Sequence, residues 1–158
     1  MWQKIKPYII SIGIALAVGG LAAFLTRDSM DIYGEIVTPP LAPPAILFPI
    51  VWTILYVLMG ISSARIYTEK ESQPEKVRSA LAIYALSLVF NFAWSLIFFN
   101  LRYFLLSVVV IAGLLVLIIK TITSYREIVP WAAYLQIPYA IWVSFATYLD
   151  VAIWLLNR

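Results

Sequence analysis

The charged residues constrain this chain most, because they leave five long stretches without any charge. These stretches contain 20, 29, 23, 17 and 22 residues, and they lie between Lys6 and Arg27, Glu35 and Arg65, Arg78 and Arg102, Arg102 and Lys120, and Glu127 and Asp150. A helix needs about 17–25 mostly apolar residues to cross a membrane. Only 12% of the 158 residues are charged, against roughly 25% in soluble domains. The pattern predicts an all-α membrane protein, a bundle of five transmembrane helices.

The lengths of the stretches predict one domain over residues 1–158, with helices at about 7–25, 45–67, 78–99, 103–125 and 128–156. The fourth helix can reach Tyr125 because Lys120 can extend its ammonium group to the membrane surface. The first stretch could also be a signal peptide. Its apolar run exceeds the usual length of about 7–15 residues, which favours a retained helix.

The basic residues predict the orientation of the bundle in the membrane. With five spans, the N-terminus and the second and fourth loops share one side and carry eight Lys and Arg residues, against three on the other side. This asymmetry predicts a cytoplasmic N-terminus and an external C-terminus. The net charge of +3 does not indicate a nucleic-acid partner, because the basic residues flank apolar runs. The lipid bilayer is the expected partner.

The sequence has no cysteine and no histidine. A disulfide, a thiolate nucleophile and a thiolate metal site are therefore excluded, and the commonest general base and haem ligand are missing. We expect no metal site and no required cofactor. Any chemistry must use aromatic side chains, a few carboxylates, or the reactivity of a ligand.

A proline-rich segment, residues 38–56, precedes and opens the second helix. It holds five of the nine prolines, and the first four keep residues 38–42 out of a helix. From about Ala45 the chain can be helical, and Phe48, Trp52 and Tyr56 recur every four residues on one face. We interpret the segment as the lid and first wall of a ligand site in the membrane. The alternative is a proline turn before an ordinary spanning helix.

Two later helices carry polar groups inside apolar runs. Asn91 needs hydrogen-bond partners either on another helix or in a cavity. Asp150 is a functional candidate by default, but its position late in the fifth helix favours a solvated place at the outer interface. Pro138 should kink that helix.

Alternating helix directions should bring many of these side chains to the same depth, in the outer half of the bundle. The candidates for ligand binding are Phe24, Phe48, Trp52, Tyr56, Asn91, Trp94, Phe98, Leu106, Trp142, Ala146 and Leu149. Aromatic walls with few polar groups suit a flat lipophilic ligand. The belts of Trp and Tyr common at membrane interfaces would also concentrate aromatic residues there.

Three segments of the sequence carry a resemblance to a known family. They are PPLAPPAILFPIVWTILYVLMG (residues 39–60), NFAWSLIFF (91–99) and PYAIWVSFATYLD (138–150). With Gly19–Gly20 in the first helix, the chain resembles the TspO/MBR family, which includes the tryptophan-rich sensory proteins of bacteria and the mitochondrial translocator protein, or peripheral-type benzodiazepine receptor. The resemblance implies a bacterial cell-membrane protein, often a homodimer, with a pocket below the first loop.

The resemblance also implies ligands and roles for particular residues. Ligands of the family include protoporphyrin IX, sterols and benzodiazepine-site drugs. Trp52 and Trp142 match two tryptophans implicated in porphyrin photochemistry, and are the candidate catalytic residues. The chain departs from the family at Leu41, where tryptophan is frequent, at Asp150, where asparagine is usual, and at Val151, where mammalian members have a tyrosine of the sterol motif.

The leading hypothesis for function is a membrane receptor or sensor that binds a tetrapyrrole such as protoporphyrin IX or another small lipophilic ligand. Light-dependent oxidation of the porphyrin is part of this hypothesis, although the sequence favours a binding protein over an enzyme. The alternatives are a transporter of porphyrins or small lipophiles, and a scaffold that modulates other membrane proteins. The sequence shows neither an inverted repeat nor a series of buried ionisable groups, and both features would favour a transporter.

Overall fold

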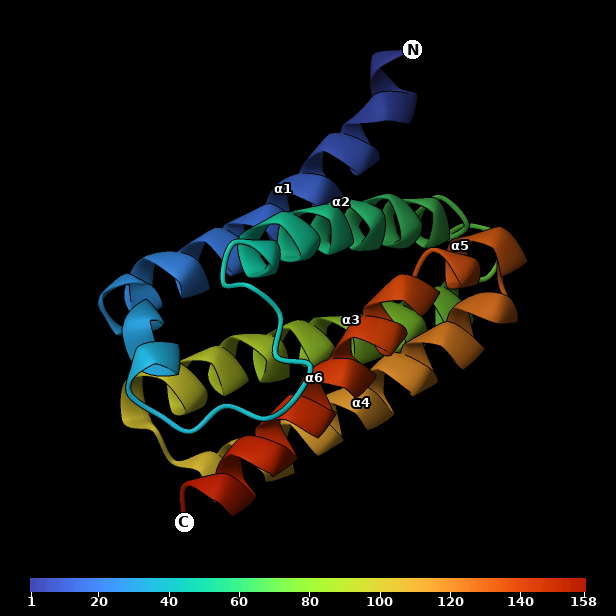
Figure 1. Cartoon of the computed structure of the whole chain (residues 1–158). Helices are drawn as coiled ribbons and strands as arrows, with labels where there is room; N and C mark the ends of the chain where they lie inside the picture. The colour runs from blue at the N-terminus through green and yellow to red at the C-terminus, as the bar shows by residue number, and fades with distance from the viewer.

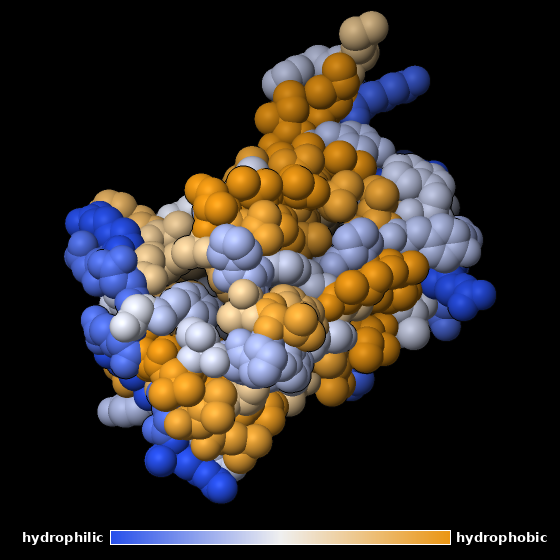
Figure 2. Space-filling view, viewed as in Figure 1, coloured by the Kyte–Doolittle hydropathy of each residue, from blue (hydrophilic) through white to orange (hydrophobic).

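The computed structural model describes all residues from Met1 to Arg158 and is entirely helical (Figure 1). The elements are α1 (Trp2–Thr26), the 3-10 helix η1 (Arg27–Gly34), α2 (Leu47–Tyr67), α3 (Pro74–Ser95), the π-helical turn η2 (Leu96–Leu101), α4 (Phe104–Arg126), α5 (Pro130–Tyr134) and α6 (Ile137–Leu156). They form five spans long and apolar enough to cross a membrane, which confirms the predicted fold class. On the face shown in Figure 2, apolar side chains cover much of the middle of the bundle, and the most hydrophilic side chains gather toward its ends.

The spans pack around one core. Helix α1 packs against α2 and α3, and α4 packs against α3, α5 and α6. The N-terminal half of α1 leans away from the other helices (Figure 1). Residues 27–46 cross the opposite end of the bundle and connect α1 to α2, so this first loop covers the end where α6 also finishes.

Two glycines allow α1 and α2 to approach closely. A Cβ atom on Gly19 would lie 2.2 Å from Cε2 of Tyr56, and one on Gly60 would lie 2.5 Å from the Cα of Ile12. Both distances are far below van der Waals contact. Glycine at these positions therefore sets the separation of the two helices, as small residues commonly do in membranes.

Prolines mark the start of α2 and the interruption of the last span. Residues 44–46 form a turn in which the N–H of Leu47 donates to the carbonyl of Pro44 at 3.0 Å, and α2 begins at Leu47. Pro49 lies in the first turn, where its missing N–H is not needed. The last span is divided into α5 and α6 at residues 135–136, just before Pro138, which cannot donate to the carbonyl four residues earlier.

The third span ends in an unusual way. After Ser95 the helix widens into the π-helical turn η2, and Arg102 then adopts a left-handed conformation with φ 55°. The left-handed conformation ends the helix and turns the chain into α4, which starts two residues later. The π turn also brings the neighbouring rings of Phe98 and Phe99 into the bundle, where both are buried.

Candidate functional site

The first loop is anchored in the bundle by two side chains. Residues 27–35 of the loop are mostly polar, but Ile32 is fully buried and Tyr33 is half-buried. The ring of Tyr33 stacks on Phe48 of α2, with centroids 5.5 Å apart and an interplanar angle of 18°. It also lies 6.3 Å from the ring of Phe98 of η2. The loop therefore closes this end of the bundle with its own aromatic group.

Polar contacts connect the same loop to residues of α6, or just beyond it, and to the end of η2. The side-chain amide of Asn157 accepts from the N–H of Val37 and donates to its carbonyl, both at 2.9 Å. Tyr148 Oη donates to the carbonyl of Pro40 at 2.9 Å. The guanidinium of Arg102 donates to Glu35 at 2.6 Å. This hydrogen bond, and then the charge of the guanidinium, hold the pKa of the Glu35 carboxyl below its ordinary value.

An aromatic cluster lies directly below the loop. The ring of Trp52 lies 5.6 Å from Tyr56, 6.4 Å from Trp94 and 6.1 Å from Tyr139. The ring of Phe48 meets Trp142 edge to face at 5.8 Å. Together with Phe98, Phe99 and Phe104, these residues form one network of ring contacts that joins the first loop, α2, α3, η2, α4 and α6.

Two polar groups are embedded in this cluster, and each is held across helices. Asn91 of α3 accepts from Tyr56 Oη at 3.2 Å and donates to Tyr139 Oη at 3.0 Å. The carboxylate of Asp150 accepts from Trp94 Nε1 at 2.9 Å and from Ser107 Oγ at 2.7 Å. Asp150 is only 1% exposed. The interpretation of Asp150 as a solvated interfacial residue is therefore wrong, because neighbouring helices supply its hydrogen bonds.

One buried donor in the region has no partner. Trp142 Nε1 is buried and makes no hydrogen bond. An unpaired buried N–H is costly, since a group that has lost water and gained no partner keeps its full desolvation penalty. The same indole meets Phe48 edge to face below the first loop.

The cavity beside the cluster is small in this structure. It has a volume of about 110 Å³ and lies between α1, α2 and α3, with Ala22, Ala23, Trp52 and Trp94 among its walls. Pockets for drug-sized ligands usually occupy about 300–1,000 Å³. A larger ligand therefore requires that the first loop or some of the aromatic rings move.

Comparison with known proteins identifies the family of the chain. The profile of the TspO/MBR family matches residues 11–155. The chain belongs to the TspO/MBR family. It is 34% identical to the tryptophan-rich protein TspO of Chlorobaculum tepidum over 158 residues, which cover 99% of both chains. It is 30% identical to the translocator protein of Bos taurus over 159 residues, covering 96% of this chain and 92% of that protein.

Most of the candidate residues of this TspO/MBR protein lie together, but two do not. Phe48, Trp52, Tyr56, Asn91, Trp94, Phe98 and Trp142 share the network, and Ala146 and Leu149 are buried on α6. The side chains of Phe24 and Leu106 are 58% and 46% exposed, and Phe24 instead lies under the guanidinium of Arg27. Leu41, at the tip of the first loop, is 80% exposed.

Several residues of the site were not predicted from the sequence. Tyr33, Phe99, Phe104, Ser107 and Tyr139 all contribute rings or hydrogen bonds. For Tyr33 a signal was present, since Ile32 and Tyr33 are an apolar pair within the polar segment RDSMDIYGE. Buried groups in an otherwise polar loop commonly anchor it to the core. The other four lie in apolar helices, where the sequence does not distinguish the core face from the lipid face.

Proposed function

We propose that the protein is a membrane receptor that binds a flat lipophilic ligand of the tetrapyrrole class, such as protoporphyrin IX, in the aromatic cluster below the first loop. The observation that carries the proposal is the continuous network of rings contributed by the loop, α2, α3, η2 and α6. Aromatic rings stack favourably on a planar π system, and each such pair contributes about 0.5–1.5 kcal/mol beyond burial. Family membership supports a role in ligand sensing.

The ring of Tyr33 occupies the position that a ligand ring would take. Tyr33 stacks on Phe48 much as a planar ligand would. Entry of the ligand then exchanges one stacking interaction for another, while the loop releases its contacts to Asn157 and Arg102. The unpaired N–H of Trp142 would donate to a carboxylate or carbonyl of the ligand.

The light-dependent oxidation of a bound porphyrin by dioxygen belongs to the same proposal. Trp52 and Trp142 are the candidate residues for this step, since both indoles belong to the ring network and are partly accessible. The protein itself contributes the binding site and the easily oxidised indole rings beside the porphyrin. No metal ligand is required for a metal-free porphyrin.

A titration of the full-length protein in lipid nanodiscs with protoporphyrin IX tests this function. We expect saturable quenching of tryptophan fluorescence with a midpoint in the micromolar range. Absence of saturable binding at these concentrations would reject the proposed function.

The Tyr33→Ala variant tests the exchange of rings. Removing the stacked ring should tighten porphyrin binding about 2- to 10-fold, the equivalent of one aromatic stacking interaction. Tyr134→Ala is the matched control, because Tyr134 is 54% exposed on α5 at the other end of the bundle. Equal affinities in Tyr33→Ala and the wild type would show that the ligand does not replace this ring.

We also propose, from the distribution of basic residues, that the N-terminus lies in the cytoplasm. A reporter that is active only in the cytoplasm, fused in turn to each terminus, tests the orientation. Reporter activity at the C-terminus alone would show that the protein has the opposite orientation.

A further inference from the structure

A second cleft, separate from the aromatic cluster, lies at the N-terminal end of the bundle. It has a volume of about 670 Å³ and lies between the first half of α1, the end of α2 and the middle of α3. The cleft exists because α1 leans away from the bundle there (Figure 1). Its volume lies within the usual range for ligand pockets of about 300–1,000 Å³.

The walls of this cleft are mostly apolar beyond its rim. Ile10 and Ile14 of α1 face Leu81 and Leu88 of α3 across it. Beyond Lys6, the lining residues of α1 run from Pro7 to Ile14, a distance of about 10 Å at 1.5 Å per residue. Half of the hydrocarbon core of a bilayer is about 15 Å thick. The cleft can therefore hold the first part of an acyl chain that enters from the N-terminal side of the membrane.

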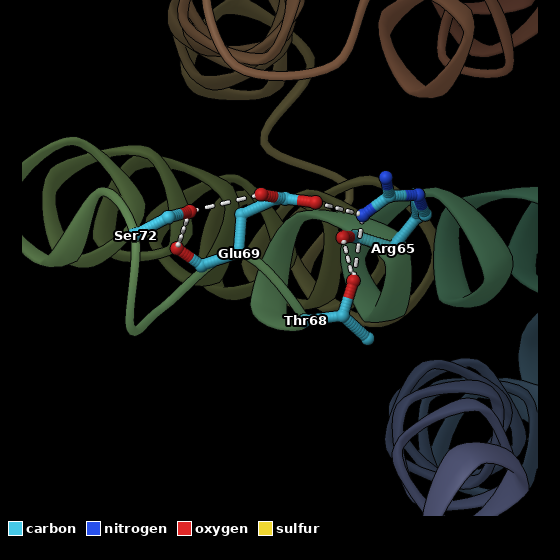
Figure 3. A network of polar contacts seen from close by, with 4 residues as sticks. All are labelled: Arg65, Thr68, Glu69 and Ser72. Atoms are coloured by element: carbon cyan, nitrogen blue, oxygen red, sulfur yellow. Dashed lines mark hydrogen bonds and ion pairs between the residues drawn. The ribbon is translucent and has the colours of Figure 1, made fainter.

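The rim of the cleft is cationic. Lys6 and Lys70 line it, and none of the lining residues is acidic. Neither lysine forms an ion pair, although Lys70 donates to Tyr67 Oη at 2.8 Å and lies 4.2 Å above its ring centre. Two glutamates adjoin Lys70 in the sequence. Glu69 is held by Arg65 at 2.7 Å and by Ser72 at 2.9 Å (Figure 3), and Glu71 neither lines the cleft nor forms an ion pair. No carboxylate therefore lies within ion-pair distance of either lysine.

The interior of the cleft also offers a hydrogen-bond donor. Tyr84 lines it, is only 7% exposed, and its hydroxyl has no hydrogen-bond partner. A buried hydroxyl is normally satisfied. An ester carbonyl of a bound lipid would accept this hydrogen bond.

We propose that this cleft is a binding site for an anionic phospholipid of the membrane leaflet at the N-terminal end. The acyl chain lies between α1 and α3, the phosphate lies between Lys6 and Lys70, and Tyr84 donates to the ester region. A phospholipid fits better than a soluble anion because most of the cleft is apolar. An anionic lipid fits better than a zwitterionic one because two lysines and no carboxylate line the cleft.

Native mass spectrometry of the full-length protein in detergent tests the charge selectivity. Phosphatidylglycerol and phosphatidylcholine with identical acyl chains are the two probes. We expect the wild type to bind phosphatidylglycerol at least about tenfold more tightly, since each surface lysine contributes about fivefold for anionic lipids. The K6Q/K70Q variant should lose this preference while its affinity for phosphatidylcholine stays the same.

A matched control distinguishes the cleft from diffuse surface charge. The K76Q/K120Q variant also removes two exposed lysines from this end of the bundle, and neither of them lines the cleft. It should keep the full preference for phosphatidylglycerol. Equal binding of the two lipids by the wild type, or equal losses in the two double variants, would overturn the proposal.

A second pair of variants tests the apolar part of the site without changing any charge. Ala85 lines the cleft and is exposed, so Ala85→Trp should fill the cleft without disturbing the core, whereas Ala82→Trp lies on the same helix outside the cleft. We expect Ala85→Trp, but not Ala82→Trp, to weaken the binding of both lipids about tenfold.

Two other occupants of the cleft can be distinguished in the same experiments. Displacement of the lipid by millimolar glycerol phosphate would indicate a site for free phosphate instead. A change of oligomeric state in Ala85→Trp with unchanged lipid binding would assign the cleft to a second copy of the chain. Either result would overturn the proposal.

Discussion

The indole of Trp94 donates a hydrogen bond to the carboxylate of Asp150 at 2.9 Å and so joins α3 to α6. Ser107 of α4 donates to the other carboxylate oxygen at 2.7 Å and also lies 2.8 Å from the carbonyl of Phe104. Three spans of the bundle therefore meet at one buried side chain. These hydrogen bonds of Asp150 hold the aromatic cluster in place below the first loop.

The Asp150→Asn variant should fold and bind ligand almost as well as the wild type. The amide oxygen can still accept from Trp94, and the amide nitrogen can donate to Ser107 Oγ, whose own proton then goes to the carbonyl of Phe104. Asp150→Leu should instead lose about 1–3 kcal/mol of unfolding free energy for each buried donor left unpaired. Thermal unfolding of both variants in detergent measures the difference. Equal destabilisation by Asn and Leu would show that the negative charge itself is required.

The helical spans were predictable from the sequence because charges are costly in the hydrocarbon core, so their spacing alone delimits the helices. The face of α2 that carries Phe48, Trp52 and Tyr56 was also predictable, since it follows from helical periodicity. The burial of Asp150 was not predictable, because it depends on Ser107, which lies 43 residues away. Ser107 is the only polar side chain in residues 104–119 of α4, and the sequence does not show which side of that helix faces α6. The exposure of Phe24 and Leu106 likewise follows from how whole helices rotate against each other.

The Gly19→Ala variant should be less stable than the wild type. The added methyl group would lie 2.2 Å from the ring of Tyr56, so the ring must move and its hydrogen bond to Asn91 must lengthen or break. Overpacking of this kind typically costs about 1–3 kcal/mol. Gly20→Ala is the matched control, since no atom lies within 4 Å of the added methyl group. Gly20→Ala should keep or raise the melting temperature, and a similar decrease in both variants would contradict the proposed contact.

The Asn157→Ala variant should loosen the first loop without unfolding the bundle. It removes two hydrogen bonds between α6 and Val37, each of which contributes about 0.5–1.5 kcal/mol. Hydrogen exchange of the Val37 amide should accelerate at least tenfold, while amides in the middle of α4 should keep their protection. If the Val37 amide exchanges at the wild-type rate, Asn157 does not hold the loop closed.

The ion pair between Glu35 and Arg102 should make the first loop sensitive to acid. The hydrogen bond and charge of Arg102 lower the pKa of Glu35 from 4.5 in the folded protein. The stabilisation is therefore fully present above pH 4.5 and is lost as the pH falls through the lowered pKa of the folded state. Limited proteolysis of residues 27–46 should accelerate over that acidic range in the wild type. In the Glu35→Gln variant, the rate of proteolysis should already be higher at neutral pH and should change less as the pH falls. If the pH profiles of proteolysis were parallel in the variant and the wild type, this ion pair would not explain the sensitivity to acid.

The last prediction concerns Trp52 and Trp142, the candidate residues for porphyrin photochemistry. Phe48 lies edge to face with Trp142 at 5.8 Å and precedes Trp52 by one helical turn on α2, so the two indoles border the same region below the first loop. Replacing either indole by a phenyl ring keeps most of the apolar area but removes an electron-rich ring and an N–H donor. Each Trp→Phe change should therefore weaken porphyrin binding by no more than about tenfold, or 1.4 kcal/mol.

The effect on light-driven loss of porphyrin should be larger than the effect on binding, because an easily oxidised indole is then missing from the site. Porphyrin absorbance during illumination and binding by fluorescence quenching are measured in parallel. Trp131→Phe is the matched control, since Trp131 is 47% exposed on α5 at the opposite end of the bundle. If the Trp52→Phe, Trp142→Phe double variant binds porphyrin and bleaches it at the wild-type rate, the two indoles have no chemical role. Slower bleaching in the double variant, with Trp131→Phe unchanged, would assign the photochemistry to this pair.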